Sequence, residues 1–184
     1  SPTTGLAYMP VQGVPVNLLD NKDWSFNTHR PGEPHSNLGW NMAMFANVEP
    51  PKSKLFGQLM AWDPVAQKPA WTVDHVGPWN GGTLATAGNL VFQGTADGRV
   101  VADRADTGQP LWEHRANSGV MAGPVTYTVN GEQYVAFSVG WGGILPLLTG
   151  PLTNKGKVRA ESRVIAFKLG ATGELPPPQA ASVL

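Results

Sequence analysis

The chain of 184 residues contains no cysteine. It therefore has no disulfide framework, no thiolate ligand for a metal ion and no thiol nucleophile. Charged residues make up 14% of the chain, and the 13 basic and 13 acidic residues leave a formal net charge of zero. A neutral chain lacks the basic surface that nucleic-acid binding requires, so we expect no nucleic-acid partner. No apolar run approaches the roughly 18 residues of a membrane-spanning helix, so we also expect no membrane span.

Glycine and proline are abundant instead, with 22 and 17 residues, about a fifth of the chain. This composition, with few charges, favours short strands joined by many turns over surface helices. Ala96-Asp97-Gly98 and Asn130-Gly131 each lie between apolar segments, and both predict β-hairpins. The fold class is predicted to be all-β.

One sequence pattern occurs twice, over Ala61–Trp71 and Ala102–Trp112, with a period of about 41 residues. A period of this length that ends in tryptophan is typical of β-propeller blades, each built from four short strands. We expect Trp71 and Trp112 to be buried between neighbouring blades, with each indole N–H bonded to a backbone carbonyl. A third copy begins at Arg163–Lys168 but reaches Gly170 and a proline run before any tryptophan.

The repeats are too few to close a propeller. At 40 to 50 residues per blade the chain makes about three and a half blades, whereas propellers have about four to eight. We therefore expect the remaining blades to come from an upstream polypeptide or a second chain. Residues 1–170 are predicted to be the propeller portion, with irregular insertions near 20–51 and, after Gly140–Gly143, up to about residue 162. Residues 171–184 are predicted to be a proline- and alanine-rich tail or linker.

Three further segments carry a family resemblance, namely Trp79–Gly98, Val120–Pro124 and Gly140–Gly143. Together with the repeats they resemble the C-terminal part of the propeller domain of pyrroloquinoline quinone (PQQ)-dependent alcohol dehydrogenases. Glu49–Ser53 is similar to the quinohaemoprotein branch. The resemblance implies an eight-bladed propeller with PQQ and Ca²⁺ on its axis. It further implies oxidation of alcohols to aldehydes or ketones in the periplasm, with an electron acceptor such as a cytochrome c.

The same resemblance gives the candidate cofactor-binding residues Trp79, Asn80, Gly143 and Ile144. Asn80 is the candidate for a polar contact with the quinone and Ile144 for an apolar one. The family's catalytic aspartate and Ca²⁺ ligands belong to earlier blades, so no catalytic residue and no metal ligand are assigned here. This segment alone is therefore predicted to be inactive. Because the chain has no Cys-x-x-Cys-His motif, we expect no covalently attached haem c in it.

Three site residues have alternative interpretations. Trp79 is either a packing residue or a wall of the cofactor site, and Asn80, followed by two glycines, is either a turn residue or a cofactor contact. Gly143, with Gly142, either supplies positive φ angles or allows close backbone approach to a ligand. The four histidines show no metal-ligand spacing. The alternative function is a non-enzymatic propeller that serves as a scaffold for protein assembly, and PQQ binding distinguishes the two.

Overall fold

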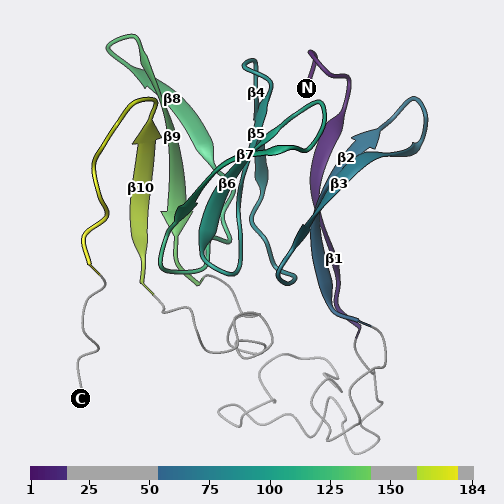
Figure 1. Cartoon of the computed structure of the whole chain (residues 1–184), viewed down its shortest axis with the longest axis horizontal. Helices are drawn as coiled ribbons and strands as arrows, with labels where there is room; N and C mark the ends of the chain where they lie inside the picture. Colours follow the sequence, from purple (N-terminus) through teal and green to yellow (C-terminus); the bar gives the residue numbers. More distant parts are fainter. Residues whose placement is uncertain (16–53, 142–160, 178–184) are drawn as a thin grey trace, which may run out of the picture. The chain divides into compact units, whose positions relative to one another are not determined.

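The computed structural model describes residues 1–15, 54–141 and 161–177. All of its strands belong to one compact unit, Ser1–Gly13 with Phe56–Leu184, and the other unit, Val14–Leu55, lies almost entirely outside the described residues. The described residues form ten β-strands and no helix (Figure 1), which confirms the all-β prediction. In chain order the strands are β1 (Ala7–Gly13), β2 (Phe56–Asp63), β3 (Lys68–His75), β4 (Thr83–Thr86), β5 (Leu90–Gly94), β6 (Arg99–Arg104), β7 (Pro110–Arg115), β8 (Val125–Val129), β9 (Glu132–Val139) and β10 (Arg163–Lys168).

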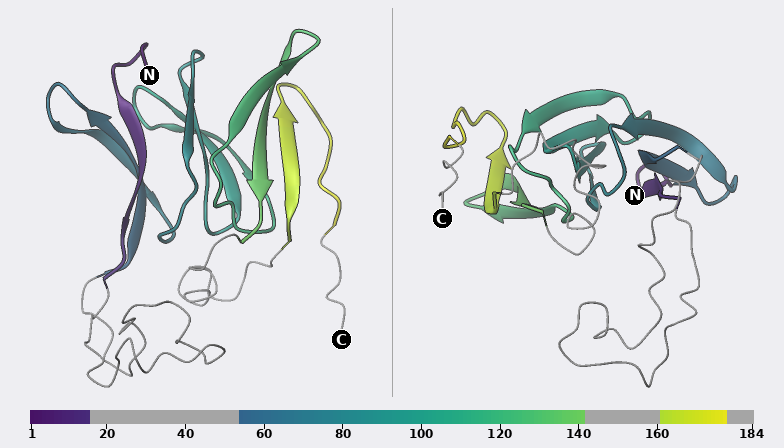
Figure 2. Two further views of the ribbon diagram at one scale, coloured as in Figure 1. Left: turned by 180° about the vertical axis from the view of Figure 1, so that it is seen from behind. Right: turned by 90° about the horizontal axis from the view of Figure 1, so that it is seen from below.

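The strands form three antiparallel sheets that follow one another along the chain (Figure 1, and Figure 2 from behind and from below). Sheet I has the order β1-β2-β3, sheet II the order β4-β5-β6-β7 and sheet III the order β10-β9-β8. The repeated sequence forms β2–β3 in sheet I and β6–β7 in sheet II. Both pairs shift register directly after the opening alanine, at Ala61/Trp62 and Ala102/Asp103. A bulge at the same repeat position in two sheets shows that the sequence repeat is also a structural repeat.

Both predicted hairpins are confirmed. Asn130 and Gly131 connect β8 to β9 with φ angles of 51° and 80°, the pair of positive angles that a type I′ turn requires. The turn from β5 to β6 contains Gly98 at φ 84°. There the Thr95 hydroxyl accepts a hydrogen bond from the Arg99 N–H at 3.0 Å.

Trp71 joins sheet I to sheet II. Its indole N–H donates to the Ala105 carbonyl at 3.1 Å, which confirms the expected backbone partner. The half-buried ring lies so close to Gly108 that a Cβ there would approach the indole to 2.5 Å. Glycine is needed at position 108 for a second reason, since its φ is 73°.

Trp112 occupies the same repeat position, but its predicted burial is wrong, because the residue is 40% exposed. Its ring meets Phe167 of sheet III edge-on, with centroids 5.0 Å apart, and stacks on His114 at 6.1 Å. The two tryptophans therefore meet different partners. Sheet III presents the Phe167 ring to Trp112, whereas sheet II presents the turn with Ala105 and Gly108 to Trp71.

The apolar core of the described residues lies between sheets II and III. Its buried members come from both sheets and from the segment between β7 and β8: Val100, Ala116, Val120, Val135, Phe137, Val139 and Ile165. Phe137 is 1% exposed and is its largest fully buried side chain. Because Val120 belongs to this core, the loop segment that contains it is anchored by packing.

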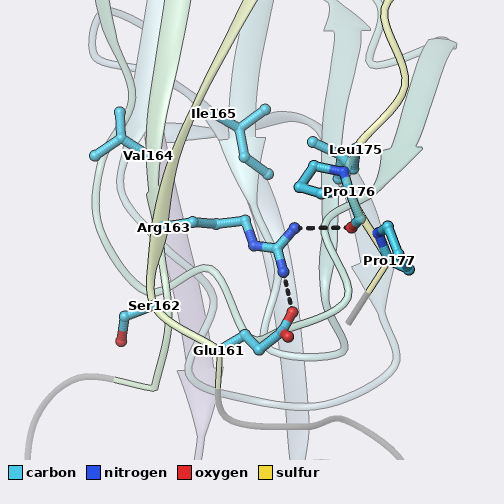
Figure 3. A pocket seen from close by; sticks show the side chains of 8 residues that line it. All are labelled: Glu161, Ser162, Arg163, Val164, Ile165, Leu175, Pro176 and Pro177. Atoms are coloured by element: carbon cyan, nitrogen blue, oxygen red, sulfur yellow. Dashed lines mark hydrogen bonds and ion pairs between the residues drawn. The ribbon is translucent and has the colours of Figure 1, made fainter. Parts of the chain in front are cut away.

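The segment after β10 is attached to that strand. Leu175 packs against the core, and the Arg163 guanidinium donates to the Pro176 carbonyl at 3.4 Å while pairing with Glu161 (Figure 3). A groove between them is lined by Glu161, Ser162, Arg163, Val164, Ile165, Leu175, Pro176 and Pro177. The tail from residue 171 stays a prediction, since residues 178–184 lie outside the described residues, as do most of the two predicted insertions. Within the described ranges, no helix has the length and apolarity to cross a membrane.

Candidate functional site

The candidate site is centred on the loop between β3 and β4, residues 77–82. Trp79 in this loop is half-buried and has a φ of 68°, which is rare for a large side chain. Its N–H donates to the Gln12 side chain at 2.8 Å, so β1 holds the backbone in this conformation. A rare conformation that neighbours enforce is typical of ligand-binding segments.

Asn80 uses its side chain within the protein. Its Nδ2 donates to the Gly77 carbonyl at 2.9 Å, and its Oδ1 accepts the Ala96 N–H at 3.1 Å. The Asn80 amide therefore fastens its own loop to the turn between β5 and β6, as the turn interpretation requires. One Nδ2 hydrogen has no partner among the described residues, which leaves a donor for a ligand.

The two glycines after Asn80 permit close backbone contact with the segment between β7 and β8. A Cβ on Gly81 would lie 2.7 Å from the Ala122 carbonyl oxygen and 2.9 Å from that of Val120. A Cβ on Gly82 would lie 3.1 Å from the Cα of Gly123. Space, rather than backbone angle, therefore requires glycine at position 81.

The segment between β7 and β8 also contacts the second predicted loop. The Gly140 N–H donates to the Gly119 carbonyl at 2.8 Å, and a Cβ on Gly119 would lie 2.9 Å from the Trp141 ring. The indole nitrogen of Trp141 is buried without a hydrogen-bond partner. Gly143 and Ile144 follow directly but lie outside the described residues, so their role stays a prediction.

Two residues that the sequence analysis did not select, Gln93 and His75, support the 77–82 loop through hydrogen bonds. Gln93 of β5 is fully buried, donates to the Gly81 carbonyl at 2.8 Å and lies 2.8 Å from His75 Nε2. Burial lowers the pKa of His75, although the hydrogen bond with Gln93 opposes the shift. A polar residue in an otherwise apolar buried strand was the available signal for Gln93.

The free donors of the site are N–H groups, on Asn80 and on Trp141. N–H donors suit the carbonyl oxygens of a quinone, which only accept hydrogen bonds. The described residues contain no cluster of His, Asp or Glu that could hold a metal ion. The donor set of this chain therefore fits a quinone, and the described part offers no site for its metal.

Comparisons with known proteins agree with this chemistry. The family model of the PQQ-containing glucose/ethanol/alcohol dehydrogenase β-propeller domain matches residues 52–135. The quinohemoprotein alcohol dehydrogenase of Comamonas testosteroni is 56% identical over 182 residues, covering 95% of this chain and 26% of that protein. The 1-butanol dehydrogenase (cytochrome c) of Thauera butanivorans is 50% identical, over 96% of this chain and 25% of its own.

The fold agrees as well. The crystal structure of the Comamonas testosteroni enzyme superimposes with a TM-score of 0.80 at 54% identity, over 97% of this chain and 26% of that one. Sheets I to III are therefore propeller blades, as the repeats predicted. The chain spans about a quarter of the length of the curated relatives that it matches.

Proposed function

We propose that this chain is a segment of the β-propeller of a PQQ-dependent alcohol dehydrogenase, and that the complete enzyme oxidises alcohols to aldehydes or ketones. In this enzyme it contributes the C-terminal blades and the loops that line the PQQ chamber. The remaining blades come from polypeptide beyond these 184 residues.

One observation carries the proposal, namely 56% identity to an alcohol dehydrogenase over 95% of the chain. The geometry supports it, because the candidate loops at Asn80 and Trp141 both contact the segment 119–123. A scaffold protein needs the blades but has no need of two unpaired N–H donors on neighbouring loops.

When bound, PQQ supplies the two-electron oxidation of the alcohol. The residues of this chain would bind and orient PQQ. The free amide hydrogen of Asn80 would donate to an oxygen of the cofactor and Trp79 would form part of the chamber wall. Gly143 and Ile144 are the other two residues that we propose to contact the cofactor. The catalytic base and the Ca²⁺ ligands lie in other blades, and we assign the enzyme to the periplasm with a cytochrome c as electron acceptor.

Substitution of Asn80 by alanine tests the cofactor contact in the complete enzyme. The change removes two protein hydrogen bonds and one proposed cofactor bond. It should therefore lower the unfolding midpoint of the apoenzyme and, separately, weaken PQQ binding by about 3- to 100-fold, the value of one hydrogen bond with or without an unpaired group. PQQ titration and the PQQ-induced rise in melting temperature measure the second effect against the first.

Ile144→Trp is the complementary variant. It narrows the chamber without removing a polar group, so it should change the ratio of turnover with a bulky alcohol to that with a short one, at nearly unchanged PQQ affinity. The site assignment fails if PQQ affinity survives Asn80→Ala and the alcohol profile survives Ile144→Trp.

A further inference from the structure

Gln93 is a large polar side chain in the interior, and it links three separate parts of the chain. It lies on β5 in sheet II and is 0% exposed. One end reaches His75 at the end of β3 in sheet I, and the other reaches the backbone of the 77–82 loop. A buried amide of this size is costly unless both ends are bonded, and here both are.

The hydrogen bonds run in one direction. The Gly81 carbonyl can only accept, so the amide nitrogen of Gln93 faces it and the Gln93 oxygen faces His75. His75 must then carry its hydrogen on Nε2 and donate it to Gln93 at 2.8 Å. Two hydrogen bonds thus connect sheet I to the loop: the His75 N–H donates to Gln93, and the Gln93 N–H donates to the Gly81 carbonyl. We call this pair of hydrogen bonds the relay.

Gly81 is held on its other sides too. Its N–H donates to the Gly94 carbonyl at 2.9 Å. Its Cα faces the carbonyls of Val120 and Ala122, with no room for a Cβ. The bond from Gln93 completes this set by fixing the direction of the Gly81 carbonyl, and the peptide plane of Gly81 adjoins that of Asn80.

We propose that His75 and Gln93 are positioning residues that hold the 77–82 loop so that the free amide hydrogen of Asn80 faces the cofactor. The relay transmits the position of sheet I to a loop at the start of sheet II. The contact between Asn80 and the cofactor rests on the proposed function. The hydrogen bonds by which His75 and Gln93 hold the loop do not depend on it.

Gln93→Glu in the complete enzyme isolates the second bond of the relay. The glutamate keeps the size of the side chain and an acceptor for His75, but places an oxygen against the Gly81 carbonyl where a donor stood. We expect exchange of the Gly81 amide, which donates to the Gly94 carbonyl, to speed up about tenfold or more, and PQQ affinity to fall about tenfold, as for one buried hydrogen bond. The turnover number should fall more than KM rises, because binding of the alcohol itself is untouched.

Gln133→Glu is the matched control. Gln133 is exposed on β9 and donates to the Thr126 hydroxyl at 2.9 Å, so the same chemical change occurs away from the loop. It should leave loop exchange and PQQ affinity unchanged. His75→Phe removes the first bond and keeps the second, so its effect on both readouts should lie between those of the control and Gln93→Glu.

The outcomes are distinguishable. Unchanged exchange at Gly81 in Gln93→Glu overturns the relay. Faster exchange with unchanged PQQ affinity, in an enzyme that binds PQQ, overturns the positioning role. A wild-type enzyme that does not bind PQQ in the presence of Ca²⁺ refutes the proposed function instead, and hydrogen exchange still decides whether the relay holds the loop.

Discussion

The carbonyl of Ala105 accepts two hydrogen bonds from sheet I. Because the two donors share one acceptor, we expect their removal to have non-additive effects on stability. The Tyr8 hydroxyl donates to it at 2.9 Å and the Trp71 indole at 3.1 Å. Ala105 itself is 1% exposed, so water does not replace a lost donor easily. The contact joins β1 and β3 of sheet I to the turn between β6 and β7 of sheet II.

Tyr8→Phe and Trp71→Phe each remove one donor and leave the other in place. Each lost hydrogen bond should cost about 0.5–1.5 kcal/mol. The double variant leaves a buried carbonyl unpaired, which adds a desolvation penalty of about 1–3 kcal/mol. We therefore expect the double variant to be destabilised by about 1–3 kcal/mol more than the sum of the single variants, within the range seen for residues that share a partner.

Native-state hydrogen exchange on the complete protein measures this coupling locally. The reporter is the Gly108 amide, which donates to the Arg104 carbonyl at 2.8 Å inside the turn, and its opening free energy reflects docking of the turn. Thr126→Val is the control, because the Thr126 hydroxyl donates to the Tyr134 carbonyl at 2.9 Å within sheet III and shares no partner with Trp71. Thr126→Val with Trp71→Phe should be additive, and additivity of Tyr8→Phe with Trp71→Phe to within about 0.5 kcal/mol would refute the reasoning.

Two further substitutions follow from burial and from space. Burial raises the pKa of Asp103 to about 6 against the opposing attraction of Arg99, so the folded state keeps this proton to higher pH than the unfolded state. The free energy of unfolding should therefore fall as pH rises from about 4 to about 6. Asp103→Asn should remove this fall and so stabilise the protein by at most about 3 kcal/mol above pH 6. Melting curves at several pH values measure the difference. Gly81→Ala would place a Cβ 2.7 Å from the Ala122 carbonyl oxygen and should cost about 1–3 kcal/mol with loss of PQQ affinity, whereas Gly173→Ala meets nothing within 4 Å and should be neutral in the same assays.

Local patterns predicted the strands and turns well, because they depend on neighbours in the sequence. Asn130-Gly131 tolerates the two positive φ angles of its turn, and the alternation of apolar residues around it identifies both strands. The repeats likewise predicted which strands are equivalent, and the structure adds a shared register shift after Ala61 and Ala102.

Contacts between sheets escaped prediction, because they depend on which residue the next sheet presents. Trp71 and Trp112 hold the same repeat position, yet one meets Gly108 and a carbonyl and the other meets Phe167. For the site, the sequence indicated the Trp79-Asn80 loop through a family resemblance. The polar residue in an apolar strand marked Gln93 as unusual but could not identify its partner, because that partner is a backbone carbonyl in the loop before β4.

Because the strands are antiparallel, the turns through which sheets I and II dock lie at the opposite end of the sheets from the candidate site. The turns that close the repeats, between β2 and β3 and between β6 and β7, lie at one end of the sheets, and the second of them receives Tyr8 and Trp71. The connections from β3 to β4, β5 to β6 and β7 to β8 lie at the opposite end (Figure 1), where Asn80, the turn after β5 and the segment 119–123 contact one another. Substitutions in the repeat turns should therefore change how tightly neighbouring blades dock while leaving PQQ affinity nearly intact. Substitutions in the opposite connections should change cofactor affinity even where the blades remain docked, and the Trp71 and Gln93 variants together test this division.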